Sequence, residues 1–311
     1  MQSQTKLAAR HALIGALIVL AAAITVSSKA IMVKLAYAYA VPFPVDASTL
    51  IALRMAFSAP FFIALAVWAH ASTSTPQVSS QDAWAIALLG VVGGYGPMLL
   101  DFEGLVYVTA GLERIILYIY PTIVVVLSAF IYKHRIGQRV YFALLATYAG
   151  VALVVGHDVV MVKSGSVGTI FGASLVAASA VAYAIYLIVS GRLIPRVGVS
   201  LFTAYTMLAA TVASSAEYAL TSHQVDIMHL PRQVYFLTML MAIVATVLPA
   251  ILLNLGIQRI GSSKAALISS IGPVSTIFLA YMFLGEDITL LQLGGTCLVL
   301  IGVMAISLGK K

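Results

Sequence analysis

Long apolar runs alternate with short polar connections along the whole chain. A helix that crosses the hydrocarbon core of a bilayer needs about 20 apolar residues, and ten runs approach or exceed that length. The expected spans are residues 12–33, 48–69, 84–107, 111–132, 139–156, 168–190, 199–220, 234–259, 264–284 and 290–308. The longest polar stretches, residues 71–82 and 221–232, are too short to form a domain. The pattern predicts an all-α polytopic membrane protein with ten transmembrane helices.

The order of proline and glycine in the first half recurs in the second half. The matched pairs are Pro97 with Pro249, Gly104 with Gly256, Pro121 with Pro273, and Gly150-Val151 with Gly302-Val303, all at an offset of 152 positions. The chain has only 10 prolines and 23 glycines among 311 residues. Four matches at one offset therefore indicate an internal repeat.

The repeat also reaches back over the first two spans, because Gly15 and Ala21–Ala23 resemble Gly172 and Ala178–Ala180. We therefore expect two repeats of five spans, residues 1–157 and residues 164–309. Five is an odd number, so the second repeat must be inverted in the membrane relative to the first. Inverted repeats of this kind form transporters, in which the substrate binds near the midplane between the halves.

Basic residues gather in the connections that a cytoplasmic N-terminus would place inside the cell. These residues are Lys6, Arg10, Lys133, Arg135, Arg139, Arg192, Arg196, Arg259, Lys264, Lys310 and Lys311, whereas outer connections hold Lys34, Lys163 and Arg232. Both termini are therefore expected in the cytoplasm. The first run, followed by Ala38-Tyr39-Ala40, also has features of a signal peptide, but its match in the second half favours a span.

Composition excludes several other classes of protein. Hydrophobic residues make up 62% of the chain and charged residues 9%, whereas soluble domains carry about 25% charged residues. The net charge of +7 comes from short clusters between apolar runs, and no basic face or soluble module remains to bind nucleic acid. Cys297 is the single cysteine, which rules out a disulfide within the chain and a cysteine-based zinc site. We expect a small-molecule substrate and the lipid bilayer as partners, with no metal and no cofactor.

Several motifs resemble one family of transporters. They are residues 104–111, 120–122 and 150–151 in the first half and residues 261–273, 284–286 and 294–303 in the second. In these stretches the chain resembles the EamA type of the drug/metabolite transporter superfamily, and it is similar to the aromatic amino acid exporters of that superfamily. The resemblance implies ten helices in inverted repeats, export of small metabolites or drugs, and a place in the bacterial inner (plasma) membrane. His134 departs from the pattern, because it stands where Glu286 stands in the second repeat.

Charged residues within the expected spans gather toward their outer ends. An intramembrane charge costs about 2.5–3.5 kcal/mol on insertion scales, so each one suggests a function. In one interpretation, Arg54 or Arg114 pairs with Asp101 or Glu103 and holds the helix ends together; we assign Arg54, Asp101 and Glu103 to this structural cluster. In the other, Glu113 and Arg114 bind the charged groups of a substrate. Asp101 and Glu103 are two residues apart, so at most one of them faces a cavity.

Aromatic and polar side chains within the spans supply further candidates. We expect Tyr95, Tyr118, Tyr183, Tyr186, Asn254, Ser269 and Ser270 to line a substrate site together with Glu113 and Arg114. Core packing is the alternative for the tyrosines, and bonding within a helix or close packing is the alternative for the serines. Pro97, Pro121, Pro249 and Pro273 each remove a helix hydrogen bond, and they are candidate hinges as well as plain kinks.

The sequence therefore predicts a transporter without enzymatic activity that exports amino acids or related zwitterions by alternating access. Export of cationic drugs is the main alternative: it calls for an unpaired acidic residue against aromatic rings, whereas an amino acid calls for both signs of charge. A channel or an intramembrane enzyme is more remote, because the six histidines lie at helix ends or in connections and no Gly-x-Ser-x-Gly motif exists. Coupling to protons through Asp101, Glu103 or Glu113 stays open.

Overall fold

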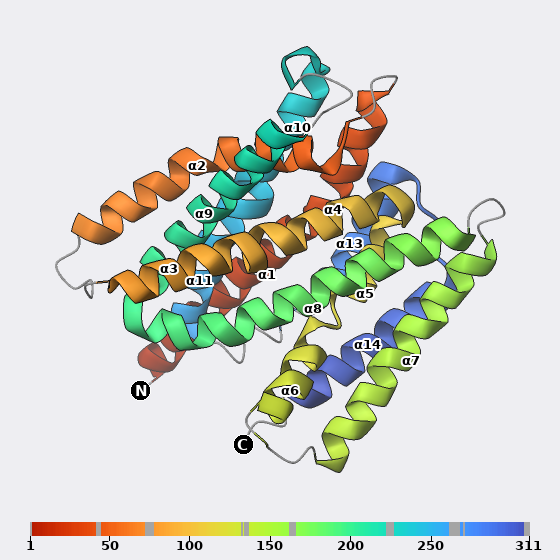
Figure 1. Ribbon diagram of the computed structural model, residues 1–311. Coiled ribbons are helices and arrows are strands. Elements are labelled where there is room, and N and C mark those ends of the chain that lie inside the picture. Colours follow the sequence, from red (N-terminus) through yellow and green to blue (C-terminus); the bar gives the residue numbers. More distant parts are fainter. Residues whose placement is uncertain are drawn as a thin grey trace.

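The computed structural model describes residues 2–41, 45–71, 78–131, 133, 137–161, 166–221, 227–260, 268–269 and 271–307, without the side chains of residues 2–12, 139, 159–161, 166, 254, 257–258 and 306–307. This part of the chain consists of helices and their connections (Figure 1). The elements are α1 (Gln2–Ala40), α2 (Ala47–Ala71), α3 (Ser80–Leu89), η1 (Gly90–Tyr95), α4 (Gly96–Tyr107), α5 (Ala110–Leu117), α6 (Tyr120–Ile131), α7 (Gln138–Met161), α8 (Ser166–Val197), α9 (Val199–Leu220), η2 (Ile227–His229), α10 (Arg232–Ala242), η3 (Ile243–Val247), α11 (Leu248–Ile260), α13 (Gly272–Leu284) and α14 (Leu290–Ser307).

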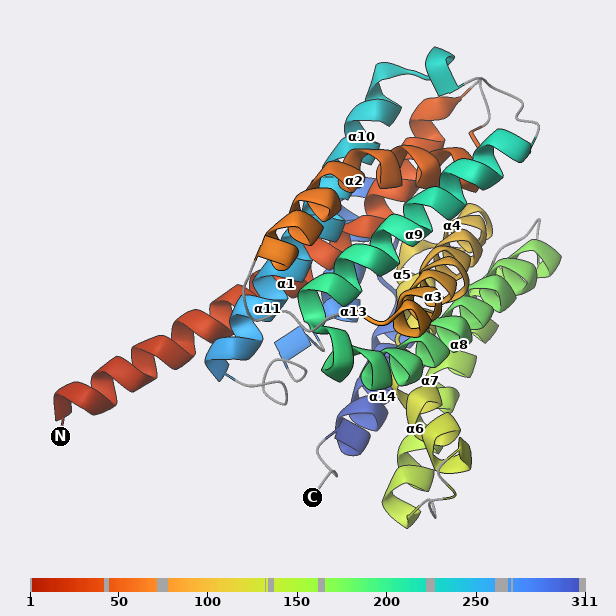
Figure 2. The same ribbon diagram turned by 60° about the vertical axis from the view of Figure 1, so that its left-hand side comes forward.

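Among the described residues these elements form ten apolar spans. Eight are long and apolar enough to cross a membrane, and the other two are the shorter apolar helices Gly272–Leu284 and Leu290–Ala305. Helix α1 begins and helix α14 ends at the same end of the bundle, here called the terminal end; the opposite end is called the distal end (Figures 1 and 2). The predicted all-α polytopic architecture is confirmed.

Several spans differ from the expected boundaries; the sixth, for example, was expected to end at residue 190, but α8 continues to Val197. The first was expected to end at residue 33, but α1 continues to Ala40. It tolerates polar residues in this extension because they find partners inside the protein; the Tyr37 hydroxyl, for example, donates to the Phe102 carbonyl at 3.0 Å. The ninth span was expected from residue 264, whereas α13 begins at Gly272 and residues 261–267 lie outside the described residues.

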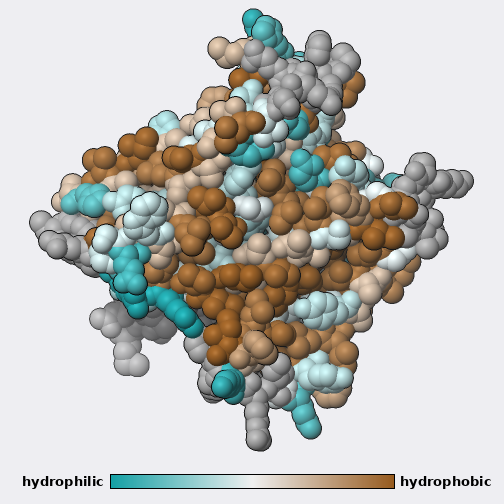
Figure 3. Space-filling view, in the orientation of Figure 1, coloured by the Kyte–Doolittle hydropathy of each residue, from teal (hydrophilic) through white to brown (hydrophobic). Residues whose placement is uncertain are grey.

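The outer surface of the bundle is apolar, as contact with lipid requires. Large hydrophobic side chains lie in the open, including Phe130 at 84% and Trp84 at 78% exposure. The space-filling view shows hydrophobic residues covering most of the middle of the visible face (Figure 3). A water-soluble protein rarely exposes such a continuous apolar surface.

The two halves pack by the same glycine contacts, as the repeat predicts. Helix α4 of the first repeat crosses α8 of the second, and a Cβ atom on Gly104 would stand 2.6 Å from Val176 Cγ2 and 3.0 Å from the Gly172 carbonyl oxygen. Helix α11 of the second repeat crosses α1 of the first, and a Cβ atom on Gly256 would stand 2.2 Å from Val19 Cγ2. Glycine is used at both crossings because the backbones approach too closely for a side chain.

Helices α7 and α14, which end the two repeats, also pack against each other through equivalent glycines. A Cβ atom on Gly150 would lie 2.6 Å from the Gly295 carbonyl oxygen, and one on Gly302 would lie 2.5 Å from the Ala143 carbonyl oxygen. Residues 143 and 295 are themselves one repeat offset apart. The contact is therefore nearly two-fold symmetric, as expected for two inverted copies of one unit.

Four spans are interrupted at the four prolines that the repeat matches. The π-helical segments η1 and η3 lie just before Pro97 and Pro249. Pro121 and Pro273 each occupy the second position of a helix, in α6 and α13. A proline removes a backbone donor and disturbs the preceding turn, and π-helical turns often occur at functional sites. Each repeat thus breaks its third and fourth spans at equivalent points.

Neighbouring glycines on α14 provide a test of the packing. A Cβ atom on Gly295 would stand 2.2 Å from Val154 Cγ2 and 2.7 Å from the Gly150 carbonyl oxygen, whereas one on Gly294 would meet no described atom within 4 Å. We expect Gly295→Ala to destabilise the protein by about 1–3 kcal/mol through overpacking, and Gly294→Ala to stabilise it slightly because alanine favours helix. Melting temperatures of the purified variants measure the difference; equal values would contradict the packing.

Candidate functional site

A cavity of about 470 Å³ lies between the two repeats. Both halves contribute to its wall, through α1, α2, η1, α4, α5 and α6 from the first repeat and α8, α9, η3, α11 and α13 from the second. Its polar and aromatic lining residues are Lys29, Arg54, Asp101, Arg114, Tyr118, Tyr120, Ser179, Tyr183, Tyr186, Thr246 and Ser269. The volume suits a small metabolite, since ligand pockets usually measure about 300–1,000 Å³.

The interrupted spans form part of this wall. Gly93, Gly94 and Pro97 line the cavity from η1 and α4, and Thr246 and Pro249 line it from η3 and α11. The carbonyl oxygen of Pro97 accepts a hydrogen bond from the Ser179 hydroxyl at 2.7 Å. Backbone groups next to a break need such partners, because hydrocarbon offers none.

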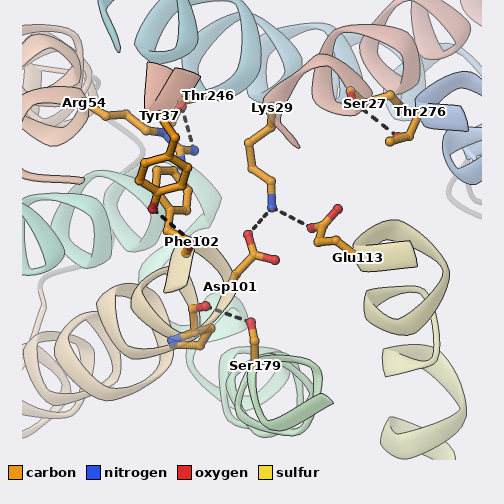
Figure 4. Close-up of polar contacts among 11 residues, drawn as sticks. Ser27, Lys29, Tyr37, Arg54, Asp101, Phe102, Glu113, Ser179, Thr246 and Thr276 are labelled. Atoms are coloured by element: carbon orange, nitrogen blue, oxygen red, sulfur yellow. Dashed lines mark hydrogen bonds and ion pairs between the residues drawn. The ribbon is translucent and has the colours of Figure 1, made fainter. Parts of the chain in front are cut away.

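Lys29 joins two buried carboxylates beside the cavity (Figure 4). Its ammonium pairs with Asp101 and lies 3.2 Å from Glu113 Oε1. The Asp101 side chain is 4% exposed and that of Glu113 0%. Asp101 and Lys29 line the cavity, whereas Glu113, which was expected to bind the substrate, is not among the lining residues. Three spans thus meet at one charge cluster, in which a single cation forms ion pairs with two acidic groups.

The expected pairing of Arg54 with Asp101 or Glu103 is wrong. Among the described residues Asp101 pairs with Lys29, and the Arg54 guanidinium donates instead to Thr246 Oγ1 from Nε at 3.0 Å and from Nη2 at 2.9 Å. The sequence pattern favoured the nearest acidic residues, but the inverted repeat places the π-helical segment η3 of the second half next to α2. Arg54 therefore lines the cavity and bonds across the two halves.

Glu103, the third member of the expected structural cluster, is half-buried and lies apart from Lys29. The charged groups that act on it are Asp46 and Glu217. It does not line the cavity, whereas Asp101 does. The expectation that at most one of these two acidic residues faces the cavity agrees with this placement.

Helix α5 places Arg114 in the cavity wall. The carboxylate of Glu286 accepts hydrogen bonds from the Ala110 backbone N–H at 2.8 Å and the Gly111 N–H at 3.2 Å, which fixes the start of this helix. The Arg114 guanidinium lies close to the start of α13, where a Cβ atom on Gly272 would stand 3.6 Å from its Nη2. A residue from the second half thus secures the helix that carries Glu113 and Arg114.

Tyrosines form one continuous wall of the cavity. Tyr118 and Tyr120 flank the break between α5 and α6, and their ring centroids lie 6.1 Å apart. Tyr120 meets Tyr183 edge-on at 5.1 Å, and Tyr183 stacks on Tyr186 at 5.8 Å. Tyr118, Tyr183 and Tyr186 therefore line the cavity between the halves, and their contact with a substrate stays a prediction.

Other expected site residues lie elsewhere. Tyr95 is buried in the hydrophobic core of the distal end and does not line the cavity; Gly93, Gly94 and Pro97 occupy the cavity face of its span, so its side chain is on another face. Ser269 lines the cavity. The side chain of Asn254 and the whole of Ser270 lie outside the described residues. Of the four expected hinges, Pro97 and Pro249 line the cavity, while Pro121 and Pro273 are not among its lining residues.

Four polar or aromatic lining residues belonged neither to the expected substrate site nor to the expected charge cluster: Lys29, Tyr120, Ser179 and Thr246. Lys29 lay in a charged stretch that suggested an outer helix end. Tyr120 directly precedes the repeated Pro121, which could have drawn attention to it. A threonine inside an apolar span does not stand out in the sequence as a site residue. Thr246 contributes to the cavity because the fold places it where it accepts hydrogen bonds from Arg54.

The charge cluster yields a prediction for stability. Lys29→Met would leave two buried carboxylates without their cation, and removing one partner from a buried ion pair costs about 3–5 kcal/mol. We expect a large drop in melting temperature, part of which returns when Glu113→Gln is added. Lys34→Met serves as the control, because Lys34 forms no ion pair with a described residue. A Lys29→Met variant as stable as the control would contradict the cluster's structural role.

Comparison with known proteins agrees with this architecture. The model of the EamA-like transporter family matches residues 13–156 and residues 170–308. A relative from Bacillus subtilis (strain 168), the uncharacterized transporter YcbK, is 30% identical over 324 residues that cover 100% of both chains. The uncharacterized inner membrane transporter YicL of Salmonella typhimurium is 27% identical over 231 residues, covering 74% of this chain and 75% of its own.

A protein of known crystal structure shares the fold, with a TM-score of 0.62 and 18% identity over 94% of this chain and 96% of the other. The two stretches matched by the family model cover most of the sequence and fall one in each half of the chain. The chain is therefore a membrane transporter that belongs to the EamA-like transporter family.

Proposed function

We propose that the protein exports a small zwitterion, an amino acid or a close relative, by alternating access between its two repeats. The observation that carries this proposal is the cavity between the halves, which is lined both by cationic and acidic groups and by a wall of tyrosines. A zwitterion needs both signs of charge within a few ångströms, and the tyrosine rings offer an apolar surface for its side chain.

The charge balance favours a zwitterion over a cationic drug. The described lining residues include three cations, Lys29, Arg54 and Arg114, and one acid, Asp101, an excess of two positive charges. A cationic drug would therefore meet net repulsion, whereas the carboxylate of an amino acid would meet attraction.

Packing at the distal end of the bundle supports alternating access. The largest core cluster joins α1, α2, α4, α9 and α10 toward the distal end, so this conformation is closed there. Opening the distal end requires the halves to part along these contacts. The breaks at Pro97, Pro121, Pro249 and Pro273 are the points at which the third and fourth spans of each repeat would bend.

Counterflow in proteoliposomes tests the function. Vesicles loaded with unlabelled phenylalanine or leucine should transiently accumulate the labelled amino acid from outside, because a carrier exchanges substrate and a channel does not. External tetraphenylphosphonium should leave this exchange unaffected. If the cation alone exchanges and neither amino acid does, the protein is a drug exporter and the proposal fails.

Tyr183 gives a sharper form of the same test. Tyr183→Phe keeps the ring contacts with Tyr120 and Tyr186 and removes the hydroxyl. Loss of one hydrogen bond to substrate should slow counterflow by about two- to tenfold with little change in melting temperature. Tyr95→Phe, away from the cavity, is the matched control and should keep its rate. Equal effects in the two variants would remove Tyr183 from the site.

For the coupling ion we propose the proton, held by Asp101 and Glu113. Asp101 Oδ1 and Glu113 Oε2 are buried and receive no hydrogen bond from a described residue, although the two carboxyl groups lie within hydrogen-bonding reach of each other. A proton on one group would supply the missing donor. Lys29 and Arg114 face the same pair. A substrate ammonium that reaches Asp101 would displace this proton, which links substrate to proton movement.

A pH-sensitive dye inside phenylalanine-loaded vesicles checks the coupling. Dilution into phenylalanine-free medium should acidify the lumen of wild-type vesicles as substrate leaves and protons enter. Glu113→Gln should abolish the acidification while some exchange remains, and Glu103→Gln, remote from Lys29, should behave as wild type. Acidification that persists in Glu113→Gln vesicles would show that this carboxyl group does not carry the proton.

A further inference from the structure

Arg54 is a buried cation whose hydrogen bonds are incomplete. It lies in the first half of α2, is 6% exposed and lines the cavity. Its guanidinium lies over the Phe102 ring, 5.6 Å from the centroid, and both Nε and Nη2 donate to the single oxygen Thr246 Oγ1. These contacts hold the group in one orientation (Figure 4).

The remaining side of the guanidinium has no hydrogen-bond partner among the described residues. A guanidinium has five N–H donors in a planar fork, and Arg54 Nη1 is buried without a hydrogen bond to any described residue. No acidic group of the described chain pairs with Arg54 within 4.0 Å. Unmade hydrogen bonds of a buried charged group are costly, so an unsatisfied group of this kind calls for an explanation.

The other cations of the cavity show why Arg54 is distinctive. Lys29 is engaged by Asp101 and Glu113. Arg114 is half-buried, and its Nε also lacks a hydrogen-bond partner among the described residues. Arg54 differs because Thr246 and Phe102 already orient its guanidinium. Nη1 is therefore a hydrogen-bond donor held in a fixed orientation. The neutral Thr246 fixes the group without cancelling its charge.

We propose that Arg54 recognises the carboxylate of the transported molecule, with Nη1 as the donor. This role of Arg54 rests on the function proposed above and defines the substrate class. The substrate must have a carboxylate, and its aromatic or aliphatic group packs on the wall of Tyr183 and Tyr186. Arginine binds carboxylates through charge-assisted hydrogen bonds that are roughly twice as strong as neutral ones. Arg54 thus acts as a specificity-determining residue, and its bond to Thr246 positions it.

Binding of three related probes to the purified full-length protein tests this role. Phenylalanine has both charges, 3-phenylpropanoate has only the carboxylate, and phenylalaninamide has only the ammonium. In competition with labelled phenylalanine, we expect 3-phenylpropanoate to compete and phenylalaninamide to compete at least about tenfold more weakly than phenylalanine, as for the loss of a charge-assisted hydrogen bond. If phenylalaninamide competes as well as phenylalanine, Arg54 does not bind the substrate carboxylate. That result would not contradict amino acid transport as the function.

Variants separate recognition from stability. Arg54→Gln should lose phenylalanine binding by about tenfold or more. Arg54→Lys keeps the charge and should retain the preference for phenylalanine over its amide with weaker binding. Thr246→Val removes the positioning hydrogen bonds; we expect a lower melting temperature with the carboxylate preference kept. Unchanged phenylalanine affinity in a folded Arg54→Gln or Arg54→Lys variant would overturn the proposal. Binding of tetraphenylphosphonium alone by the wild type would instead reject the proposed function.

Discussion

The hydrocarbon core of a bilayer offers no hydrogen-bond partner, and this constraint shapes the whole molecule. Every charge and every broken helical turn has to be satisfied within the protein. Lys29, Arg54 and Asp101 accordingly lie at the cavity between the halves. The π-helical segments η1 and η3 face the same space through Gly93 and Thr246. The most costly polar groups of the chain are therefore concentrated where a substrate can reach them.

The polar contacts of this region run between the two repeats. Arg54 of the first repeat donates to Thr246 of the second. Ser27 donates to the Gly272 carbonyl at 3.0 Å, and Glu286 receives the first N–H groups of α5. A movement of one repeat against the other changes each of these bonds. The groups that contact the substrate are thus joined to the interface that alternating access has to rearrange.

Much of the fold follows from the sequence, because apolar runs define spans and the matched prolines and glycines define the repeat. The tyrosine wall was also predictable, since polar-tipped rings inside spans need a polar neighbour or a wet cavity. The partners of the charged residues could not be predicted from the sequence. Which acid meets Lys29 depends on how α1 packs against α4 and α5, and the bond from Arg54 to Thr246 depends on the inverted packing of the second half. Sequence proximity carries no information about either contact.

Accessibility of the cavity from each side of the membrane tests the central claim most directly. Ala250 lines the cavity and is half-buried. A single cysteine at this position, in a Cys297→Ser background, can be challenged with an impermeant thiol reagent in right-side-out and inside-out vesicles. Alternating access predicts modification from both sides, slowed in each case by saturating phenylalanine or leucine. Modification from only one side, or from both with no protection by either amino acid, would contradict a transported zwitterion in this cavity.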